Sequence, residues 1–195
     1  MEQAILARHA ETELNLREIL NGDASHDVRL TRRGREQARA LGRAAGTVDV
    51  VAHTEFGRTR ETAELAWPEA PKLVVPELNE IRFGRFEGTH WADGYHEWAR
   101  SSSPLDPCPG GGESRAEAIR RYLRGYRTLL DRAERVVALV AHGAQVRYVL
   151  LALAGSPPVP VLEGVLPATP YRVTRGELER AVALIEEWVR EPAWR

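Results

Sequence analysis

The chain has 195 residues, of which 43% are hydrophobic and 28% are charged. This composition is typical of a globular protein with a substantial core, and the length suits one domain rather than two. Its 27 Lys and Arg residues nearly balance its 28 Asp and Glu residues, and the net charge of -1 argues against a nucleic-acid binder that works through bulk charge.

Four short apolar segments predict β-strands. They are rich in Val, Leu, Ala and Ile and do not alternate strictly with polar residues, which is typical of strands covered on both faces. In chain order, these segments are residues 4–9, 49–54, 72–76 and 135–142.

Helical patterns fill the intervals between these strands. Residues 31–45 place Ala38 and Leu41 on one face, opposite a face rich in arginine. Ser114 and Glu117 match the S-x-x-E capping box that starts many helices. The predicted helices are residues 31–45, 57–66, 113–134 and 143–155.

The alternation of strands and helices predicts an α/β fold. We expect a three-layer sandwich, with a mostly parallel central sheet and helices on both faces, in a single domain over residues 1–195. Residues 77–112 are too long for a plain connection, which indicates a substrate cap. Residues 176–188 have a helical period, but the same segment could also form an edge strand.

Targeting signals are missing from the sequence. The N-terminus enters an apolar strand at once, without the charged start and long apolar stretch of a secretory signal. No apolar run approaches the ~20 residues that a membrane span needs. Cys108 is the only cysteine, so it has no partner for an internal disulfide. We therefore expect a soluble cytoplasmic protein that contacts neither membranes nor nucleic acids.

Chemically active side chains gather at the ends of the predicted strands. The first strand ends in Arg8 and His9, and the last ends in His142 and Gly143, while Arg58 begins the helix that follows the second strand. Ligands of an open parallel sheet bind outside the carboxyl ends of its strands. Each of these residues alone would more often be structural, but their joint placement at one edge predicts a functional site.

This set of residues suits phosphoryl transfer. Arg8 and Arg58 can hold a phosphate dianion through paired charge-assisted hydrogen bonds, and the helix that starts at Gly143 can add backbone N–H donors. A neutral imidazole among these cations is a good nucleophile, and a second histidine can donate to the phosphoryl oxygens. A carboxylic acid at the rim can protonate the leaving oxygen. The arginines already neutralise the charge, so we expect no metal and no cofactor.

Six motifs occur in order along the chain: "RHAET" (8–12), "DVRLTRRGREQARALG" (27–42), "TEFGRTRETA" (54–63), "LNEIRFGRFEG" (78–88), "PGGGES" (109–114) and "LVAHG" (139–143). With these motifs the sequence resembles the histidine phosphatase superfamily, in the branch of cofactor-dependent phosphoglycerate mutases and their small phosphatase relatives. The resemblance covers nearly the whole chain and implies the phosphoglycerate mutase-like fold.

The resemblance also implies roles for individual residues. His9 would be the nucleophile that becomes phosphorylated, His142 a second catalytic histidine, and Glu80 the proton donor. The phosphate would be held by Arg8, Asn15, Arg58, His142 and Gly143.

The sequence departs from the family pattern at Ala10, at His53, at Glu55, which replaces the usual Pro or Asp, and in the tail after Gly155. Ala10 stands where the family usually has a glycine after the nucleophile, so the backbone there must tolerate a Cβ. His53 precedes Thr54, where the family commonly has a small residue. His53 could line the pocket, but a structural histidine at a strand end is the more common case.

The predicted cap contains candidates for substrate specificity. Arg82 and Arg85 could bind a second acidic group of the substrate. The aromatic side chains that follow could form a substrate surface, or equally a local core under a long loop; they are Trp91, Tyr95, His96 and Trp98. The arginines of the helix at 113–134 are expected to form its solvated face.

The short segment between Glu80 and His142 favours a phosphatase, because a compact cap lets water reach a phosphohistidine. We expect a metal-independent phosphomonoesterase that acts on a small phosphorylated metabolite. The alternative is a phosphoglycerate mutase-type phosphoryl transferase, which must exclude water. A non-catalytic binder of phosphorylated ligands is disfavoured, because it would need neither a nucleophile nor an acid. The sequence leaves open whether the chain is a monomer or a homodimer.

Overall fold

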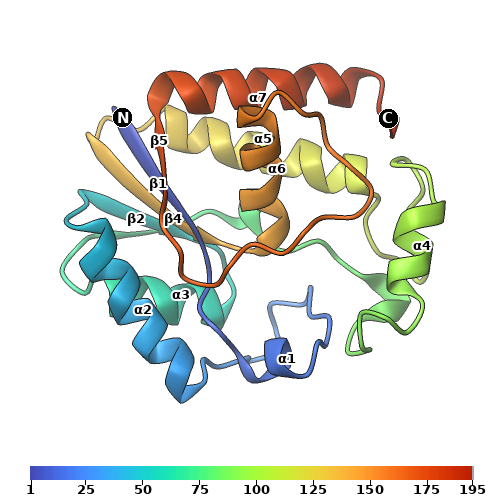
Figure 1. Cartoon of the computed structure of the whole chain (residues 1–195), viewed down its shortest axis with the longest axis horizontal. Coiled ribbons are helices and arrows are strands. Elements are labelled where there is room, and N and C mark those ends of the chain that lie inside the picture. Colours follow the sequence, from blue (N-terminus) through green and yellow to red (C-terminus); the bar gives the residue numbers. More distant parts are fainter. Residues whose placement is uncertain (195) are drawn as a thin grey trace.

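Five strands form one sheet in the order β3-β2-β4-β1-β5 in this computed structural model, which describes residues 1–194 (Figure 1). The first four strands are parallel, and β5 runs antiparallel to β1 at the edge. The predicted α/β fold is therefore confirmed. The bounds of the strands are β1 (Gln3–Arg8), β2 (Val50–His53), β3 (Lys72–Val74), β4 (Val136–Ala141) and β5 (Tyr171–Thr174).

Helices cover both faces of this sheet (Figure 1). The helices are α1 (Glu13–Leu16), α2 (Arg32–Ala45), α3 (Gly57–Ala66), α4 (Tyr95–Ser101), α5 (Arg115–Leu130), α6 (Gly143–Leu153) and α7 (Arg175–Arg190). One face packs against α2 and α3, and the other packs against α5, α6 and α7. Within the described part of the chain, no helix combines the length and the apolar character needed to cross a bilayer.

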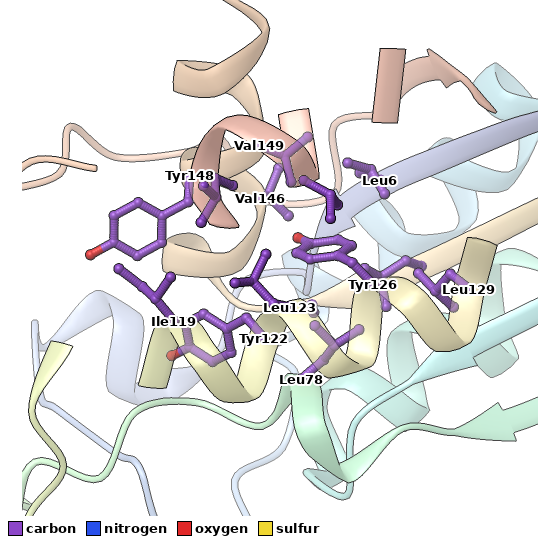
Figure 2. Close-up of a cluster of buried hydrophobic side chains, with 14 of the residues drawn as sticks. Leu6, Leu78, Ile119, Tyr122, Leu123, Tyr126, Leu129, Val146, Tyr148 and Val149 are labelled. Carbon is purple, nitrogen blue, oxygen red and sulfur yellow. The ribbon is translucent and has the colours of Figure 1, made fainter. Parts of the chain in front are cut away.

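Successive residues of β1 point into opposite layers. Ile5 packs in the layer of α2 and α3, where it shares a cluster with Leu41. Leu6 packs in the opposite layer, among the side chains of α5 and α6 that Figure 2 shows, including Tyr126 and Leu129. Because both faces are buried, the strand reads as a continuous apolar run rather than an alternating one.

Side-chain caps begin the two longest helices. Ser114 Oγ accepts a hydrogen bond from the backbone N–H of Glu117 at 3.1 Å, and the Glu117 carboxylate accepts from the Ser114 N–H at 2.9 Å. This is the capping box predicted from the sequence. Thr174 and Glu177 form the same arrangement at the start of α7. The ambiguous segment 176–188 is therefore helical, and the edge strand is β5, just before it.

The segment 77–112 has little regular structure. It holds the end of one 3₁₀ turn (Pro76–Leu78), a second turn (Gly84–Phe86) and the short helix α4. Aromatic rings pack against one another here, with ring centroids 5.0 Å apart between Phe83 and Tyr95 and 5.8 Å apart between Tyr95 and Trp98. These aromatic side chains therefore include a local core.

The arginines of α5 do not all face solvent, so that prediction is wrong for two of them. Arg115 is only 3% exposed. Arg121 donates to the carbonyl oxygens of Glu77, Asn79 and Glu80, so it fixes the segment that leads into Glu80. A helical arginine pattern cannot reveal this burial, because the covering residues come from elsewhere in the chain.

Gly42 marks a close approach between α2 and α3. A Cβ at this position would lie 2.0 Å from the carbonyl oxygen of Ala66. We expect Gly42→Ala to lower the free energy of unfolding by about 2 kcal/mol, despite the better helix propensity of alanine. Gly176 in α7 is the matched control, since its Cβ would meet only the end of the Arg180 side chain at 3.6 Å. Denaturant unfolding followed by circular dichroism should find Gly176→Ala neutral or stabilising; similar losses at both positions would contradict the argument.

Candidate active site

The carboxyl ends of three parallel strands bring the candidate residues together. β4 lies between β1 and β2, and the register pairs Arg8 with Ala141. The residues that directly follow these strands, His9, Thr54 and His142, therefore lie at one edge of the sheet. This is the edge where ligands of parallel α/β sheets bind.

The His9 ring is buried and held in one tautomer. Its Nδ1 lies 2.8 Å from the carbonyl oxygen of Ala10, an acceptor, so Nδ1 carries the proton. Its Nε2 accepts a hydrogen bond from Arg58 Nε at 3.2 Å. Burial, together with the charges of Arg58 and Arg8, holds the pKa of His9 well below its ordinary value of 6.5. The ring is therefore a neutral imidazole with the free electron pair on Nε2.

Arg58 is the hydrogen-bonding centre of the site. Besides His9, its guanidinium donates to the side-chain and backbone oxygens of Asn21 and, at 3.1 Å, to Nδ1 of His142. Its guanidinium carbon also lies 4.2 Å from the ring centroid of Phe56. Burial lowers the pKa of Arg58 to about 10, so the side chain remains a cation at neutral pH.

The second histidine, His142, is also neutral. Its Nδ1 accepts from Arg58, so its proton lies on Nε2, which donates to Thr54 Oγ1 at 3.0 Å. The side chain is fully buried, and this burial, reinforced by the Arg58 charge, holds its pKa well below 6.5. The two imidazoles meet edge to face, with centroids 5.5 Å apart.

Glu80 supplies a carboxylate beside the two histidines. Its Oε2 lies 3.9 Å from Nδ1 of His142, and its Oε1 accepts from the backbone N–H of Ile81 at 3.0 Å. The side chain is 15% exposed. Burial raises the pKa of Glu80 above its ordinary value of 4.5, although the charge of Arg58 opposes this shift. A carboxyl group with a raised pKa suits proton donation.

Arg8 offers a free charged donor. One of its terminal nitrogens donates to the carbonyl oxygen of Val165 at 3.0 Å. Its Nε is buried and has no hydrogen-bond partner among residues 1–194. Gly143, the first residue of α6, lies against it, because a Cβ built on Gly143 would be 3.9 Å from Arg8 Nε. An anion bound here would satisfy this buried N–H group.

Most of these side chains line a cavity of about 120 Å³, but neither His142 nor Gly143 is among its lining residues. Asn15 lies in its wall, but its Oδ1 is engaged as the acceptor of the Thr12 N–H and hydroxyl in the capping box of α1. The predicted residues that line the cavity are Arg8, His9, Asn15, Arg58 and Glu80.

Other predicted residues lie elsewhere. Arg82 approaches the Glu113 carboxylate at 4.0 Å, and Arg85 lies over the ring of Phe86 at 5.0 Å. Both arginines are exposed, and neither lines the cavity. His53 is buried with its Nδ1 2.7 Å from the carbonyl oxygen of Thr54. Its ring contacts the backbone at the end of β2 and does not line the cavity.

Sequence reasoning missed residues that support the site. Asn21 binds Arg58 from a loop without a recognisable motif, and nothing in the sequence signals this role. Thr62, one turn after Arg58, accepts from the backbone N–H of Ala10 at 3.0 Å. Ala10 adopts no left-handed conformation, which explains why alanine can replace the family's glycine there. Thr54 directly follows β2, and a polar residue at the carboxyl end of a parallel strand is a signal that could have identified it from the sequence.

Comparisons with known proteins show the family of this chain. Residues 4–190 match the model of the histidine phosphatase superfamily, branch 1. The chain belongs to this superfamily. The resemblance of its motifs is thereby confirmed, and the family's substrates are phosphorylated small molecules.

Relatives within the superfamily include mutases and phosphatases. The chain is 33% identical over 172 residues to a 2,3-bisphosphoglycerate-dependent phosphoglycerate mutase of Methylobacterium sp. (strain 4-46), covering 77% of this chain and 80% of the relative. A solved alpha-ribazole phosphatase from Shigella flexneri is 28% identical, with a TM-score of 0.67 over 80% of this chain and 81% of that one. A solved protein from Thermus thermophilus is 33% identical, with a TM-score of 0.68 over 88% and 92% of the two chains.

The neutral buried histidines predict a dependence of stability on pH. In the unfolded chain a histidine has a pKa of about 6.5, whereas the pKa of His142 in the fold is well below that value. The unfolded state therefore binds more protons in this window, and the free energy of unfolding should fall as the pH drops below about 6.5. Urea unfolding between neutral and mildly acidic pH should find a shallower fall in His142→Gln than in the natural protein. Equal slopes would contradict burial of an uncharged ring.

Proposed function

We propose that the protein is a metal-independent phosphomonoesterase that hydrolyses a small phosphorylated metabolite through a phosphohistidine on His9. The observation that carries this proposal is the unprotonated Nε2 of His9, which lies in the cavity 3.2 Å from a buried arginine. Nucleophile, cations and acid are all side chains of this chain. The charge of a phosphate dianion is then balanced by Arg8 and Arg58 without a metal.

The reaction has two steps. His9 Nε2 attacks phosphorus, the bond from phosphorus to the ester oxygen breaks, and the Glu80 carboxylic acid donates its proton to the leaving alcohol. Water then attacks the phosphohistidine while the Glu80 carboxylate accepts a proton from it, and phosphate leaves with His9 restored. When the substrate binds, the Arg58 N–H groups that donate to His9 and His142 donate to the phosphoryl oxygens instead.

Charge around the cavity favours the phosphatase over the mutase. A mutase that holds a bisphosphorylated acid needs cations for a second acidic group. Arg82 and Arg85, the candidates for that role, lie outside the cavity. The mutase remains the second candidate, because the curated relative from Methylobacterium is one. A binder without catalysis would need neither the neutral Nε2 of His9 nor the raised pKa of Glu80.

The direct test is phosphate release in the presence of EDTA. We expect the natural protein to hydrolyse p-nitrophenyl phosphate under these conditions, and His9→Asn to lose at least ~10³-fold in kcat, because it lacks the nucleophile. His90→Asn is the matched control, since that ring pairs with Glu18 at the surface and should leave kcat unchanged. Labelling that is quenched in alkaline detergent, which preserves the acid-labile P–N bond, should trap a phosphohistidine only where His9 is present.

The mutase has a different signature in the same assay. Conversion of 3-phosphoglycerate to 2-phosphoglycerate that depends on bisphosphoglycerate, with little free phosphate, would overturn the phosphatase proposal. Binding of phosphate without turnover in either assay would favour the non-catalytic binder.

The pKa shifts predict the pH profile of this activity. Activity should fall at low pH where His9 becomes protonated, and the lowered pKa of His9 moves this limb below pH 6.5. It should fall at high pH where Glu80 loses its proton, and the raised pKa of Glu80 moves that limb above 4.5. Glu80→Gln should lower kcat about 100-fold for an alkyl phosphate and change the alkaline limb. An unaltered alkaline limb in this variant would exclude Glu80 as the acid.

A further inference from the structure

A second cavity of about 200 Å³ adjoins the cavity around His9. The two share Leu20, Glu80 and Phe83 in their walls. Glu80 is the proposed acid for the leaving alcohol, so an ester whose phosphate reaches His9 would place its alcohol at the mouth of this second cavity. The inference that follows rests on the proposed function for that orientation.

The walls of the second cavity are mainly apolar and aromatic. They come from the cap, from α5 and α6, and from the long segment between α6 and β5 that sweeps across the front of the molecule (Figure 1). Among the lining residues only Glu80 is acidic. The side chains that dominate the walls are Trp91, Tyr95, Tyr122, Tyr148, Val161 and Leu162. Such walls favour an apolar ligand over a charged one.

Arg115 is the single arginine in these walls, and its charge is already engaged. Its terminal nitrogens donate to the carbonyl oxygens of Ala99, Ser102 and Ser103 and to the Ser102 hydroxyl at 2.7–3.1 Å. The forked edge that recognises a carboxylate or phosphate is therefore occupied by protein oxygens. Only the Nε–H of Arg115, which has no partner among residues 1–194, is left, so an anionic group in this cavity would lack a paired contact.

Two indole rings contact the buried guanidinium of Arg115. Its guanidinium carbon lies 4.5 Å from the ring centroid of Trp98 and 5.1 Å from that of Trp194, in the C-terminal tail. Trp194 also donates from its Nε1 to the carbonyl oxygen of Ser102 at 2.9 Å, and so ties the tail to the cap. Cation–π contacts stabilise a buried guanidinium without a carboxylate partner. The arginine therefore serves as part of the wall.

One lining residue of the cavity, Tyr122, carries a polar atom without a partner. The Tyr122 hydroxyl is buried and has no hydrogen-bond partner among residues 1–194. Figure 2 shows the hydroxyls of Tyr122 and Tyr148 at the same edge of the core cluster, on the side away from Leu6 and Leu129. Burial holds the pKa of Tyr122 well above its ordinary value, so this phenol is a neutral donor. A ligand with one acceptor atom would satisfy it.

From these observations we propose that the second cavity binds the alcohol part of the substrate, and that this alcohol carries an uncharged aromatic group. The substrate class is thus a phosphate monoester of an aromatic alcohol, in contrast to a phosphorylated sugar acid. The aromatic group lies between the cap and α5, and the ester oxygen faces Glu80.

Binding of phosphonates tests this proposal without any need for turnover. Calorimetry would compare naphthylmethylphosphonate with propylphosphonate and 2-carboxyethylphosphonate, which share the phosphate-like head and differ in the attached group. We expect the naphthyl compound to bind at least ~10-fold more tightly than either of the others, because it buries an aromatic ring. Equal affinities would overturn the proposal, and so would tightest binding of the carboxyethyl compound.

Variants locate the preference in the second cavity. Ala118 is a small, buried lining residue of α5, so Ala118→Leu should fill the cavity and reduce the preference to about threefold or less. Tyr126→Phe is the matched control, because the Tyr126 hydroxyl donates to the carbonyl oxygen of Gln145 and does not line this cavity. It should keep the full preference. A preference that survives Ala118→Leu, in a variant that retains its native circular dichroism, would place the ring elsewhere and overturn the proposal.

Hydrolysis of the matching esters separates this inference from the proposed function. Naphthylmethyl phosphate and propyl phosphate are both alkyl esters, so their ratio of kcat/KM reports recognition rather than leaving-group chemistry. A ratio of ~10 or more supports both proposals. Selective phosphonate binding without hydrolysis of either ester would overturn the phosphatase and leave the aromatic site standing. Hydrolysis of both esters at equal kcat/KM, with equal phosphonate affinities, would overturn the aromatic site and leave the phosphatase standing.

Discussion

The buried guanidinium of Arg58 connects the parts of the site that come from different segments of the chain. It donates to His9 after β1, to His142 after β4, and to Asn21 in the loop after α1. Because a guanidinium has only donors, each histidine must present an unprotonated nitrogen to it. Arg58 therefore helps to fix both tautomers and the direction of the His9 electron pair, and its charge adds to burial in lowering the pKa of both rings.

The Arg58 cation is costly to bury, and the surrounding fold reduces that cost. No carboxylate forms a direct salt bridge with Arg58 among the described residues; oxygen atoms of Asn21 and the ring of Phe56 take that place. A directly bound carboxylate would cancel the positive potential that a phosphate needs. Glu80 lies in the cavity wall with its Oε2 3.9 Å from Nδ1 of His142, and burial raises its pKa.

The two cavities differ in charge and in the chemistry of their walls. Around His9, the wall contains Arg8, whose Nε has no partner among residues 1–194, and Arg58, which donates to His9. Beyond Glu80, the one arginine is held by carbonyl oxygens and indole rings, and apolar side chains form most of the surface. The tail contributes through Trp194, so a segment remote in sequence from the nucleophile helps to shape the second cavity.

Much of the fold and of the candidate site could be predicted from the sequence by itself, because local signals carry them. Apolar runs mark the parallel strands, S-x-x-E marks the start of α5, and Arg8, His9 and His142 stand at strand ends where the topology must bring them together. Only the tertiary structure decided which arginines are buried and which are exposed. Arg82 and Arg115 look alike in the sequence, yet one is exposed and the other is enclosed by Trp98 and Trp194. Burial of a long side chain depends on residues distant in the chain, and no local pattern encodes that contact.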